Sequence, residues 1–287
     1  VMLMQMMSAG AMGGGISSAI ARALGGHRQA DAEALAWHAV LIALILGAGF
    51  TIAALLFGPA LYRALGGRGA SLSVALEYSN IVFGGAALLW LMNSLASVLR
   101  GAGDMRTPAG FMVAGAMIVI PVSPLLIFGA GPFSGMGVQG AALALVAYYF
   151  AGSAVLAWRI VRGSTLIALR PCRPAWRNFR EILKVGVPAC AHAALLNTAV
   201  AVTTGLVGVY GAAALAGYGI GARLEYLQIP IVFGLGATLV AMIGTNVGAG
   251  QYERARRIAW TGGLFAAAVC GSIGVVVTVA PWLWAGM

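Results

Sequence analysis

A segment near the start of the chain recurs 223 residues later. The stretch Leu24–Trp37 resembles Val247–Trp260, and in both places a glycine-containing polar turn lies between two long apolar runs. The matching pairs are Gly13 with Gly236, Gly25 with Gly248, Ala32 with Ala255, Ala36 with Ala259, and Trp37 with Trp260. A duplicated set of apolar helices is typical of two-lobed membrane transporters, which handle their substrate between the lobes.

The balance of apolar and charged residues excludes a soluble globule. Hydrophobic residues make up 61% of the 287 residues and charged residues only 8%, whereas soluble domains carry about a quarter charged residues. The apolar runs approach the roughly 20 residues that a membrane-spanning helix needs, and they alternate too weakly for a β-barrel. The sequence therefore predicts an all-α, polytopic membrane protein.

Eight membrane helices can be placed between turns rich in glycine and proline. They are predicted at Val1–Leu24, Ala34–Leu61, Val74–Leu99, Thr107–Phe128, Gly137–Ile160, Ile182–Val209, Ala214–Thr245 and Ala255–Trp284. The first of them opens the chain without a charged leader, which does not fit a signal peptide and suggests a piece of a longer protein.

The basic residues divide unevenly between the two ends of these helices. Only Arg63 and Arg68 fall on one side, and fourteen fall on the other. The fourteen are Arg22, Arg28, Arg100, Arg106, Arg159, Arg162, Arg170, Arg173, Arg177, Arg180, Lys184, Arg254, Arg256 and Arg257. Because basic connectors remain in the cytoplasm, this predicts a multi-pass protein of the plasma (inner) membrane. The net charge of +10 then reflects topology and contact with the lipid bilayer, and does not indicate nucleic-acid binding.

The longest basic connector predicts a division into two lobes. We expect an N-lobe at 1–161, a cytoplasmic linker at 162–181 and a partial C-lobe at 182–287. The linker is expected to be solvated and to touch anionic lipid headgroups.

Residue patterns for catalysis or cofactor binding are missing from the sequence. The three histidines are scattered, no phosphate-binding loop occurs, and the cysteines Cys172, Cys190 and Cys270 suit buried small side chains better than a disulfide or a metal site. We expect neither an enzyme nor a resident cofactor or metal. Transport driven by an ion gradient, a channel and a passive scaffold stay open.

Polar residues within apolar spans are candidates for the transport cavity, because burying them is costly unless they are paired or used. Interhelical hydrogen bonding and a position at the membrane interface are the alternatives. The candidates are Glu225, Arg223, His192, Asn197, Glu77, Tyr218 and Gln228, with Asn80 and Asn93 as further polar lining.

Prolines at membrane depth interrupt the helical hydrogen bonds and produce either fixed kinks or hinges. Pro121, Pro124 and Pro230 are the hinge candidates. A second motif, Arg100–Pro108, predicts a rigid cytoplasmic turn in which Thr107 caps the next helix and Asp104 accepts amide hydrogens or pairs with a neighbouring arginine. Its residues are Arg100, Gly101, Gly103, Asp104, Arg106 and Pro108.

Several segments together resemble the MATE (multidrug and toxic compound extrusion) family. They are Leu99–Pro108, Pro124–Phe133 with Gly137–Ala142, Gly208–Gly217, and Val247–Gly250 with the arginine-rich turn after it. The resemblance implies a twelve-helix fold of two six-helix lobes, of which this chain would cover the second to ninth helices. It also implies export of small organic, often cationic, compounds in exchange for Na⁺ or H⁺, with no oligomer required.

The family's coupling carboxylates are commonly in its first, seventh or tenth helix. The segment that matches the seventh helix, Val185–Val209, has no carboxylate, and His192 and Asn197 are its polar residues. Two alternatives remain: a flippase of lipid-linked saccharides from the same superfamily, which would need cationic residues in its cavity, and an inactive truncated membrane protein.

Overall fold

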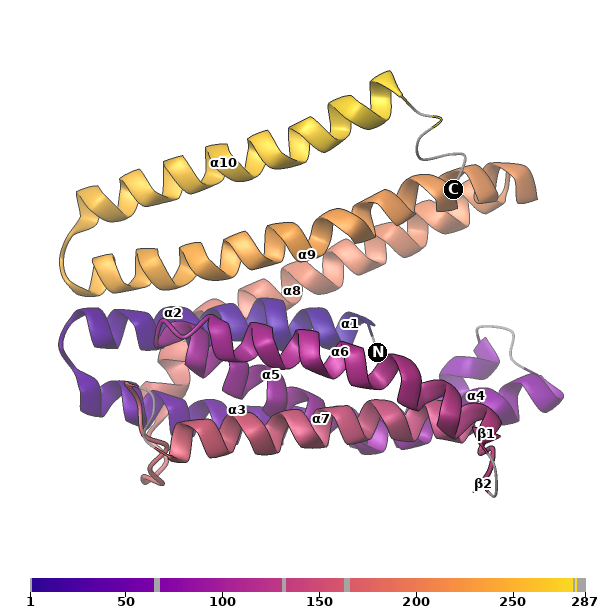
Figure 1. Cartoon of the computed structure of the whole chain (residues 1–287), viewed down its shortest axis with the longest axis horizontal. Coiled ribbons are helices and arrows are strands. Elements are labelled where there is room, and N and C mark those ends of the chain that lie inside the picture. The colour runs from indigo at the N-terminus through magenta and orange to yellow at the C-terminus, as the bar shows by residue number, and fades with distance from the viewer. Residues whose placement is uncertain (1, 65–67, 131–132, 163–165, 281, 283–287) are drawn as a thin grey trace.

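The computed structural model describes residues 2–64, 68–130, 133–162, 166–280 and 282. Helices form nearly all of this part of the chain (Figure 1). Their bounds are α1 Met2–Gln5, η1 Met6–Met12, α2 Gly13–Gly25, α3 Gln29–Ala64, α4 Gly69–Gly84, α5 Ala86–Gly101, α6 Arg106–Phe128, α7 Val138–Val161, α8 Trp176–Gly208, α9 Ala212–Gly248 and α10 Tyr252–Val279. Two antiparallel strands of two residues each, β1 Gly129–Ala130 and β2 Phe133–Ser134, follow α6.

The all-α membrane fold is confirmed. Within the described chain, six helices are long and apolar enough to cross a membrane, or seven if α4 and α5 count as one bent span. The first predicted span corresponds to α1, η1 and α2, which follow one another without a gap. The predicted helix end at Trp284 lies outside the described residues.

The prediction of one helix over Val74–Leu99 was wrong. The chain bends by 45° between α4 and α5 at Gly85. A β-carbon on Gly85 would lie 2.9 Å from a methyl group of Val146 in α7, so the glycine permits close packing at the bend.

The helices form two groups (Figure 1). Helices α1 to α7 pack together, while α8 crosses them and continues beside α9, and α10 packs on α9. The turns α2–α3, α5–α6 and α9–α10 lie at the same end of the molecule as the connector between α7 and α8 (Figure 1). This end carries most of the basic residues and is called the basic end below.

Small residues bring the helices together. A β-carbon on Gly101 would lie 2.8 Å from the carbonyl oxygen of Ser17, and one on Gly15 would lie 2.8 Å from that of Ile182. Close backbone approach of this kind stabilises helix bundles in lipid, where the hydrophobic effect between helices is weak. Large apolar side chains such as Ile120 in α6 are exposed instead and suit contact with acyl chains.

The connector between α7 and α8 differs from the solvated linker that the sequence predicts. Helix α8 begins at Trp176, so the end of the predicted 162–181 segment is helical. Ile167 is only 1% exposed, and the backbone N–H of Ala175 donates to Nε2 of the buried His38 in α3, with 2.9 Å between the nitrogens. The connector is therefore packed onto α3, because these contacts fix it there.

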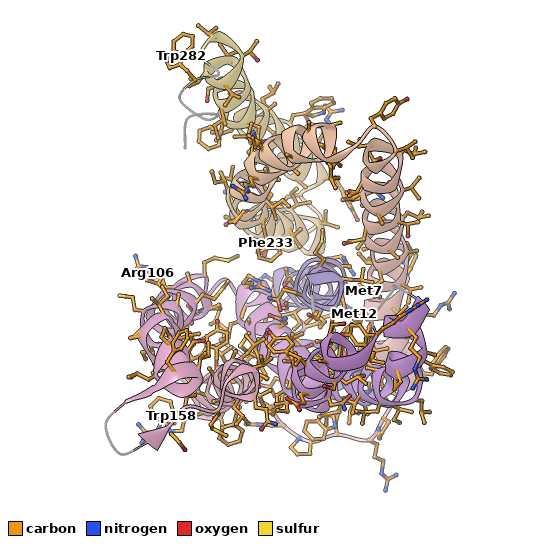
Figure 2. The ribbon with its side chains drawn as sticks, turned by 90° about the vertical axis from the view of Figure 1, so that its right-hand side faces the viewer. Met7, Met12, Arg106, Trp158, Phe233 and Trp282 are labelled. Atoms are coloured by element: carbon orange, nitrogen blue, oxygen red, sulfur yellow. The ribbon has the colours of Figure 1, made fainter. Side chains whose placement is uncertain are left out.

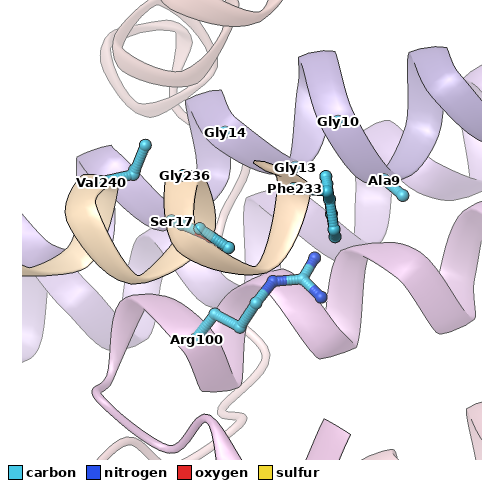
Figure 3. A pocket seen from close by; sticks show the side chains of 10 residues that line it. Ala9, Gly10, Gly13, Gly14, Ser17, Arg100, Phe233, Gly236 and Val240 are labelled. Atoms are coloured by element: carbon cyan, nitrogen blue, oxygen red, sulfur yellow. The ribbon is translucent and has the colours of Figure 1, made fainter. Parts of the chain in front are cut away.

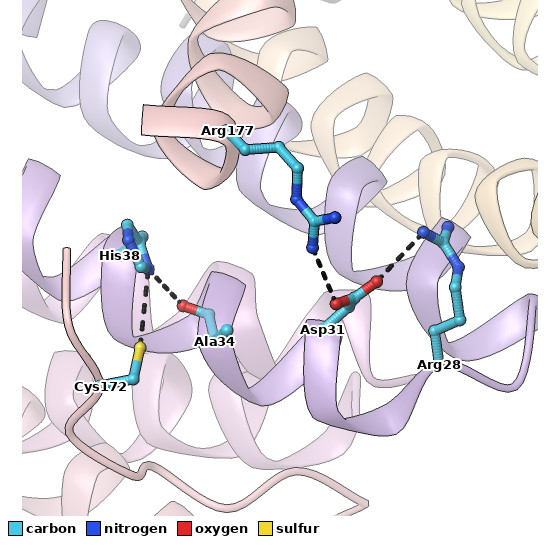
Figure 4. Close-up of polar contacts among 6 residues, drawn as sticks. All are labelled: Arg28, Asp31, Ala34, His38, Cys172 and Arg177. Atoms are coloured by element: carbon cyan, nitrogen blue, oxygen red, sulfur yellow. Dashed lines mark hydrogen bonds and ion pairs between the residues drawn. The ribbon is translucent and has the colours of Figure 1, made fainter. Parts of the chain in front are cut away.

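Ion pairs strengthen this attachment (Figure 4). Asp31 accepts from Arg28 at 3.2 Å and from Arg177 of α8 at 3.1 Å. Arg170 lies 3.8 Å from Glu33. Because the arginines are largely exposed, the pairs contribute little each, but together they fix the start of α8 and the connector before it beside the start of α3. The division into lobes at 1–161 and 182–287 stays a prediction.

Candidate functional site: a cavity between two groups of helices

A cavity of about 510 Å³ lies between α8–α9 and the N-terminal helices. A second cavity, of about 220 Å³, adjoins it between η1, α2, α5 and α9 (Figure 3). The two share the lining residues Ala9, Gly10, Arg100 and Phe233. We treat them as one site, because the same four residues line both cavities.

Small residues create the space. Ala9 and Gly10 of η1 and Gly13 and Gly14 of α2 line the smaller cavity, opposite Gly236 and other small residues of α9. The π-helical turn η1 exposes its small side chains to the site, and such turns frequently occur at functional sites. In Figure 2, Phe233 lies on the side of α9 that faces the N-terminal helices.

The lining is mostly apolar. Methionine, phenylalanine, leucine, isoleucine, alanine, proline and glycine residues provide most of the larger cavity, whose polar exceptions are Gln5, Asn93, Arg100 and His192. Among the residues that the structure describes, no aspartate or glutamate lines either cavity. An apolar pocket with a few convergent polar groups is the usual form of a binding site for a small organic compound.

Asn93 connects the wall of the site to the first turns of the chain. Its Nδ2 donates to Gln5 Oε1 at 3.2 Å and to Ser8 Oγ at 2.8 Å. Both Asn93 and Ser8 are buried. The prediction of Asn93 as polar lining therefore agrees with its position, and the same side chain also stabilises η1 through an interhelical hydrogen bond.

Arg100 occupies a different place from the one the sequence suggests. The motif places it in a cytoplasmic turn, but its side chain extends from the end of α5 into the site (Figure 3). It is 8% exposed, its guanidinium donates to Ser97 Oγ at 2.7 Å, and its Cζ lies 5.5 Å from the centre of the Phe233 ring. Arg100 is thus a cation of the cavity wall.

The rest of the Arg100–Pro108 motif forms the predicted tight turn, with one correction. Asp104, rather than Thr107, caps α6: its Oδ1 accepts from the backbone N–H of Thr107 at 3.0 Å and its Oδ2 from the Thr107 hydroxyl at 2.6 Å. Burial opposes ionisation of Asp104, but these hydrogen bonds outweigh it and hold the pKa of the carboxyl below its ordinary value. Gly103 supplies the left-handed conformation of the turn, with φ +88°.

Among the sequence-predicted candidates, the structure brings five to the cavity: Asn93, Arg100, Pro108, His192 and Pro230. Asn197 lies beside it, where its amide donates to Ala193 O at 2.8 Å and contacts Met6 Sδ at 3.4 Å. These contacts within α8 and with η1 account for the polar side chain of Asn197.

The other candidates lie elsewhere. Helix α6 passes through Pro121 and Pro124 without a break, and both prolines are exposed. Glu225 is in α9, but its side chain is outside the described part of the structure. The described candidates that line neither cavity are Glu77, Asn80, Gly101, Gly103, Asp104, Arg106, Pro121, Pro124, Asn197, Tyr218, Arg223 and Gln228.

Two functional features escaped the sequence analysis. Phe233 shows no signal beyond its apolar setting, although it contacts Arg100 across the two groups of helices. The η1 turn could have been suspected from the glycines at positions 10 and 13 to 15, which weaken a regular helix.

A membrane-spanning bundle with a cavity between two groups of helices is the architecture of a secondary transporter. Comparison with known proteins gives the family. The MatE family model matches residues 1–125 and 188–287, and the chain belongs to this family of multidrug efflux transporters. It is a multi-pass protein of the plasma membrane, as predicted.

Relatives and solved structures agree. The chain is 31% identical to the FAD transporter of Shewanella oneidensis over 86% of its length and 55% of that protein, and 27% identical to the probable multidrug resistance protein NorM of Thermotoga maritima over 93% of its length and 58% of that protein. It thus spans little more than half of these relatives.

Two solved structures superpose on almost the whole chain. One is an outward-facing MATE transporter of the MOP superfamily, with TM-score 0.83, 26% identity, and coverage of 100% of this chain and 62% of that one. The other is a MOP superfamily transporter from Pyrococcus furiosus, described as having a binding pocket of reverse polarity, with TM-score 0.84, 26% identity, and coverage of 99% and 62%.

Proposed function

We propose that the protein carrying this chain exports small organic compounds by antiport with Na⁺ or H⁺, using alternating access to the cavity between the two groups of helices. One observation carries the proposal: the cavity adjoins a point where α2 and α9 are packed backbone to backbone at the basic end. Substrate would therefore enter or leave at the opposite end in this state.

The size and lining of the site support an organic substrate. A volume of about 510 Å³ falls in the range of small-molecule pockets, and its walls are mainly apolar. Relatives named for multidrug resistance and for FAD transport indicate compounds with large ring systems. We further propose that the activity requires neither a second copy of the chain nor a chemical reaction.

Coupling to an ion needs a group that binds the ion in one state and releases it in another. Of the polar side chains described at the cavity, His192 is the first candidate for binding the exchanged ion. Glu225 in α9 is the second candidate from the sequence. We infer no resident cofactor beyond the exchanged ion.

The test is uptake of a fluorescent organic cation into inside-out vesicles that contain the natural full-length protein, under imposed Na⁺ or H⁺ gradients. Uptake that follows one gradient is expected, and the effective ion identifies the coupling chemistry. His192→Ala should abolish H⁺-driven uptake if His192 carries the proton. Absence of uptake with either gradient, for a folded protein and for organic anions as well as several organic cations, would contradict export and favour the inactive or the flippase alternative.

A further inference from the structure

Arg100 is a buried cation that has no counter-ion among the described residues. Within the described chain, no carboxylate forms an ion pair with its guanidinium, whose contacts are Ser97 Oγ at 2.7 Å and the ring of Phe233 at 5.5 Å. A hydroxyl and a ring face satisfy only part of the five N–H donors of an arginine. An unpaired charge in an apolar setting is costly, so such residues inside membranes are generally used.

We propose that Arg100 binds the anionic group of the transported compound, so that the site accepts organic anions that carry a phosphate or a carboxylate beside an apolar ring system. This inference rests on the proposed function and adds a substrate class to it. The planar guanidinium fork matches the oxygens of either group in a bidentate fashion. Figure 3 shows the fork directed into the space between η1 and α9.

The surroundings of Arg100 fit such a compound. Phe233 and Phe111 contribute aromatic faces, and Met6, Met92 and Met112 provide adaptable apolar contacts around the larger cavity. The acidic group would lie at Arg100, where the two cavities join, and the ring system would occupy the larger cavity. The described lining residues thus offer a cation, Arg100, to the acidic group of a substrate.

A matched pair of ligands tests the assignment. Riboflavin and flavin mononucleotide share one fluorescent ring system and differ by one phosphate, so their difference in affinity isolates the anionic contact. Binding to the purified full-length protein is measured by fluorescence quenching for wild type, Arg100→Gln, Arg100→Lys and Arg257→Gln. The last variant removes a positive charge from the exposed surface of α10 and serves as the control.

Wild type and Arg257→Gln should bind the phosphorylated flavin roughly tenfold or more tightly than riboflavin. Arg100→Gln should remove that preference by weakening the phosphorylated flavin far more than riboflavin, while Arg100→Lys should keep a reduced preference. Equal affinities in wild type, or equal loss of both ligands in Arg100→Gln, would overturn the proposal. If the protein takes up organic cations but shows no preference for the phosphorylated flavin, the assignment of Arg100 as an anion site is wrong. The proposal of export is then unaffected.

The anionic group could belong to a soluble compound or to a lipid headgroup, and a second arm of the experiment separates them. Binding is repeated in lipid nanodiscs of zwitterionic phosphatidylcholine and in nanodiscs that also contain anionic phosphatidylglycerol. Displacement of the phosphorylated flavin by the anionic lipid, seen in wild type and not in Arg100→Gln, would support the site with a lipid headgroup as ligand. Unchanged binding would support a soluble organic anion.

Discussion

Ala21 of α2 and Gly244 of α9 occupy equivalent places of the internal repeat, and they touch each other. A β-carbon on Gly244 would lie 2.8 Å from the β-carbon of Ala21. Two further contacts are related by the same 223-residue offset: Gly25 packs against the backbone of Thr245, and Gly248 packs against that of Arg22. The pseudo-two-fold axis of the repeat therefore passes between α2 and α9 at the basic end.

This symmetric contact closes the basic end. The described glycines toward the other end of α9 make no such close contact with another helix. A β-carbon on Gly217, Gly219 or Gly221 would meet open space. We infer that the two copies of the repeat form the cytoplasmic closure of this state. The solved MATE transporter that superposes on the whole chain is described as outward-facing, a conformation that is closed on the cytoplasmic side.

Gly248→Ala should weaken the closure, because the added methyl group overlaps the carbonyl oxygen of Arg22 and forces α2 and α9 apart. Overpacking of this kind costs about 1–3 kcal/mol. Spin labels attached to Ala30→Cys and Gln251→Cys, with the native cysteines replaced, should report a longer distance across the basic end. The matched control is Gly263→Ala, where the methyl group meets open space. An unchanged distance distribution in Gly248→Ala would refute the glycine closure.

His38→Phe should release the connector between α7 and α8. In the native protein Nε2 of His38 accepts from Ala175 N–H, so the neutral ring carries its proton on Nδ1 and donates to Ala34 O at 2.7 Å. Phenylalanine keeps the ring and leaves the Ala175 N–H unpaired, a loss of about 1–3 kcal/mol.

Cys172 provides the readout, since its sulfur lies 4.0 Å from Nδ1 of His38 (Figure 4). The rate of Cys172 alkylation by a maleimide should be at least roughly five times higher in His38→Phe than in wild type. Alkylation of Cys270, on α10, serves as the internal control and should not change. Equal rates at Cys172 in both proteins would show that the hydrogen bond does not hold the connector.

Asp104→Asn should destabilise the α5–α6 turn by about 1 kcal/mol at neutral pH, because a charged cap at the start of α6 is replaced by a neutral one. The pKa of Asp104 is lowered in the folded state, so its stabilisation is complete above the ordinary aspartate pKa and is lost as the pH falls through the lower, folded-state value.

Thermal unfolding in detergent, followed by tryptophan fluorescence, should thus show a difference between wild type and Asp104→Asn at pH 7 that shrinks on acidification toward about pH 3. Thr107→Val is the companion variant, because it removes the hydroxyl donor and keeps the backbone donor. A stability difference that grows toward low pH would show that the ionised Asp104 carboxylate does not stabilise the turn.

The sequence predicted those features that depend on long apolar runs and charge placement. The all-α fold, the family and most helix ends follow from patterns that extend over tens of residues, and are confirmed. The bend at Gly85 was missed because the apolar run continues through Gly84 and Gly85, and only packing against Val146 decides that the chain turns there.

The cavity was less accessible to sequence reasoning. Arg100 has the same immediate neighbours whether its side chain faces water or the site, and Phe233, which decides the matter, is distant in sequence. Pro121 and Pro124 satisfied the rule for a hinge, yet they lie on the exposed surface of α6, whereas Pro230 lies at the cavity. Their roles as hinges stay predictions.

We infer that the cavity opens on the side opposite the basic end in this state. Ala9 lines both cavities, so Ala9→Cys, in a variant without native cysteines, reports access directly. A membrane-impermeant maleimide should label this position in intact cells and fail to label it in inside-out vesicles, until a substrate and ion gradient shifts the protein to the other state. Labelling confined to inside-out vesicles under all conditions would contradict the account.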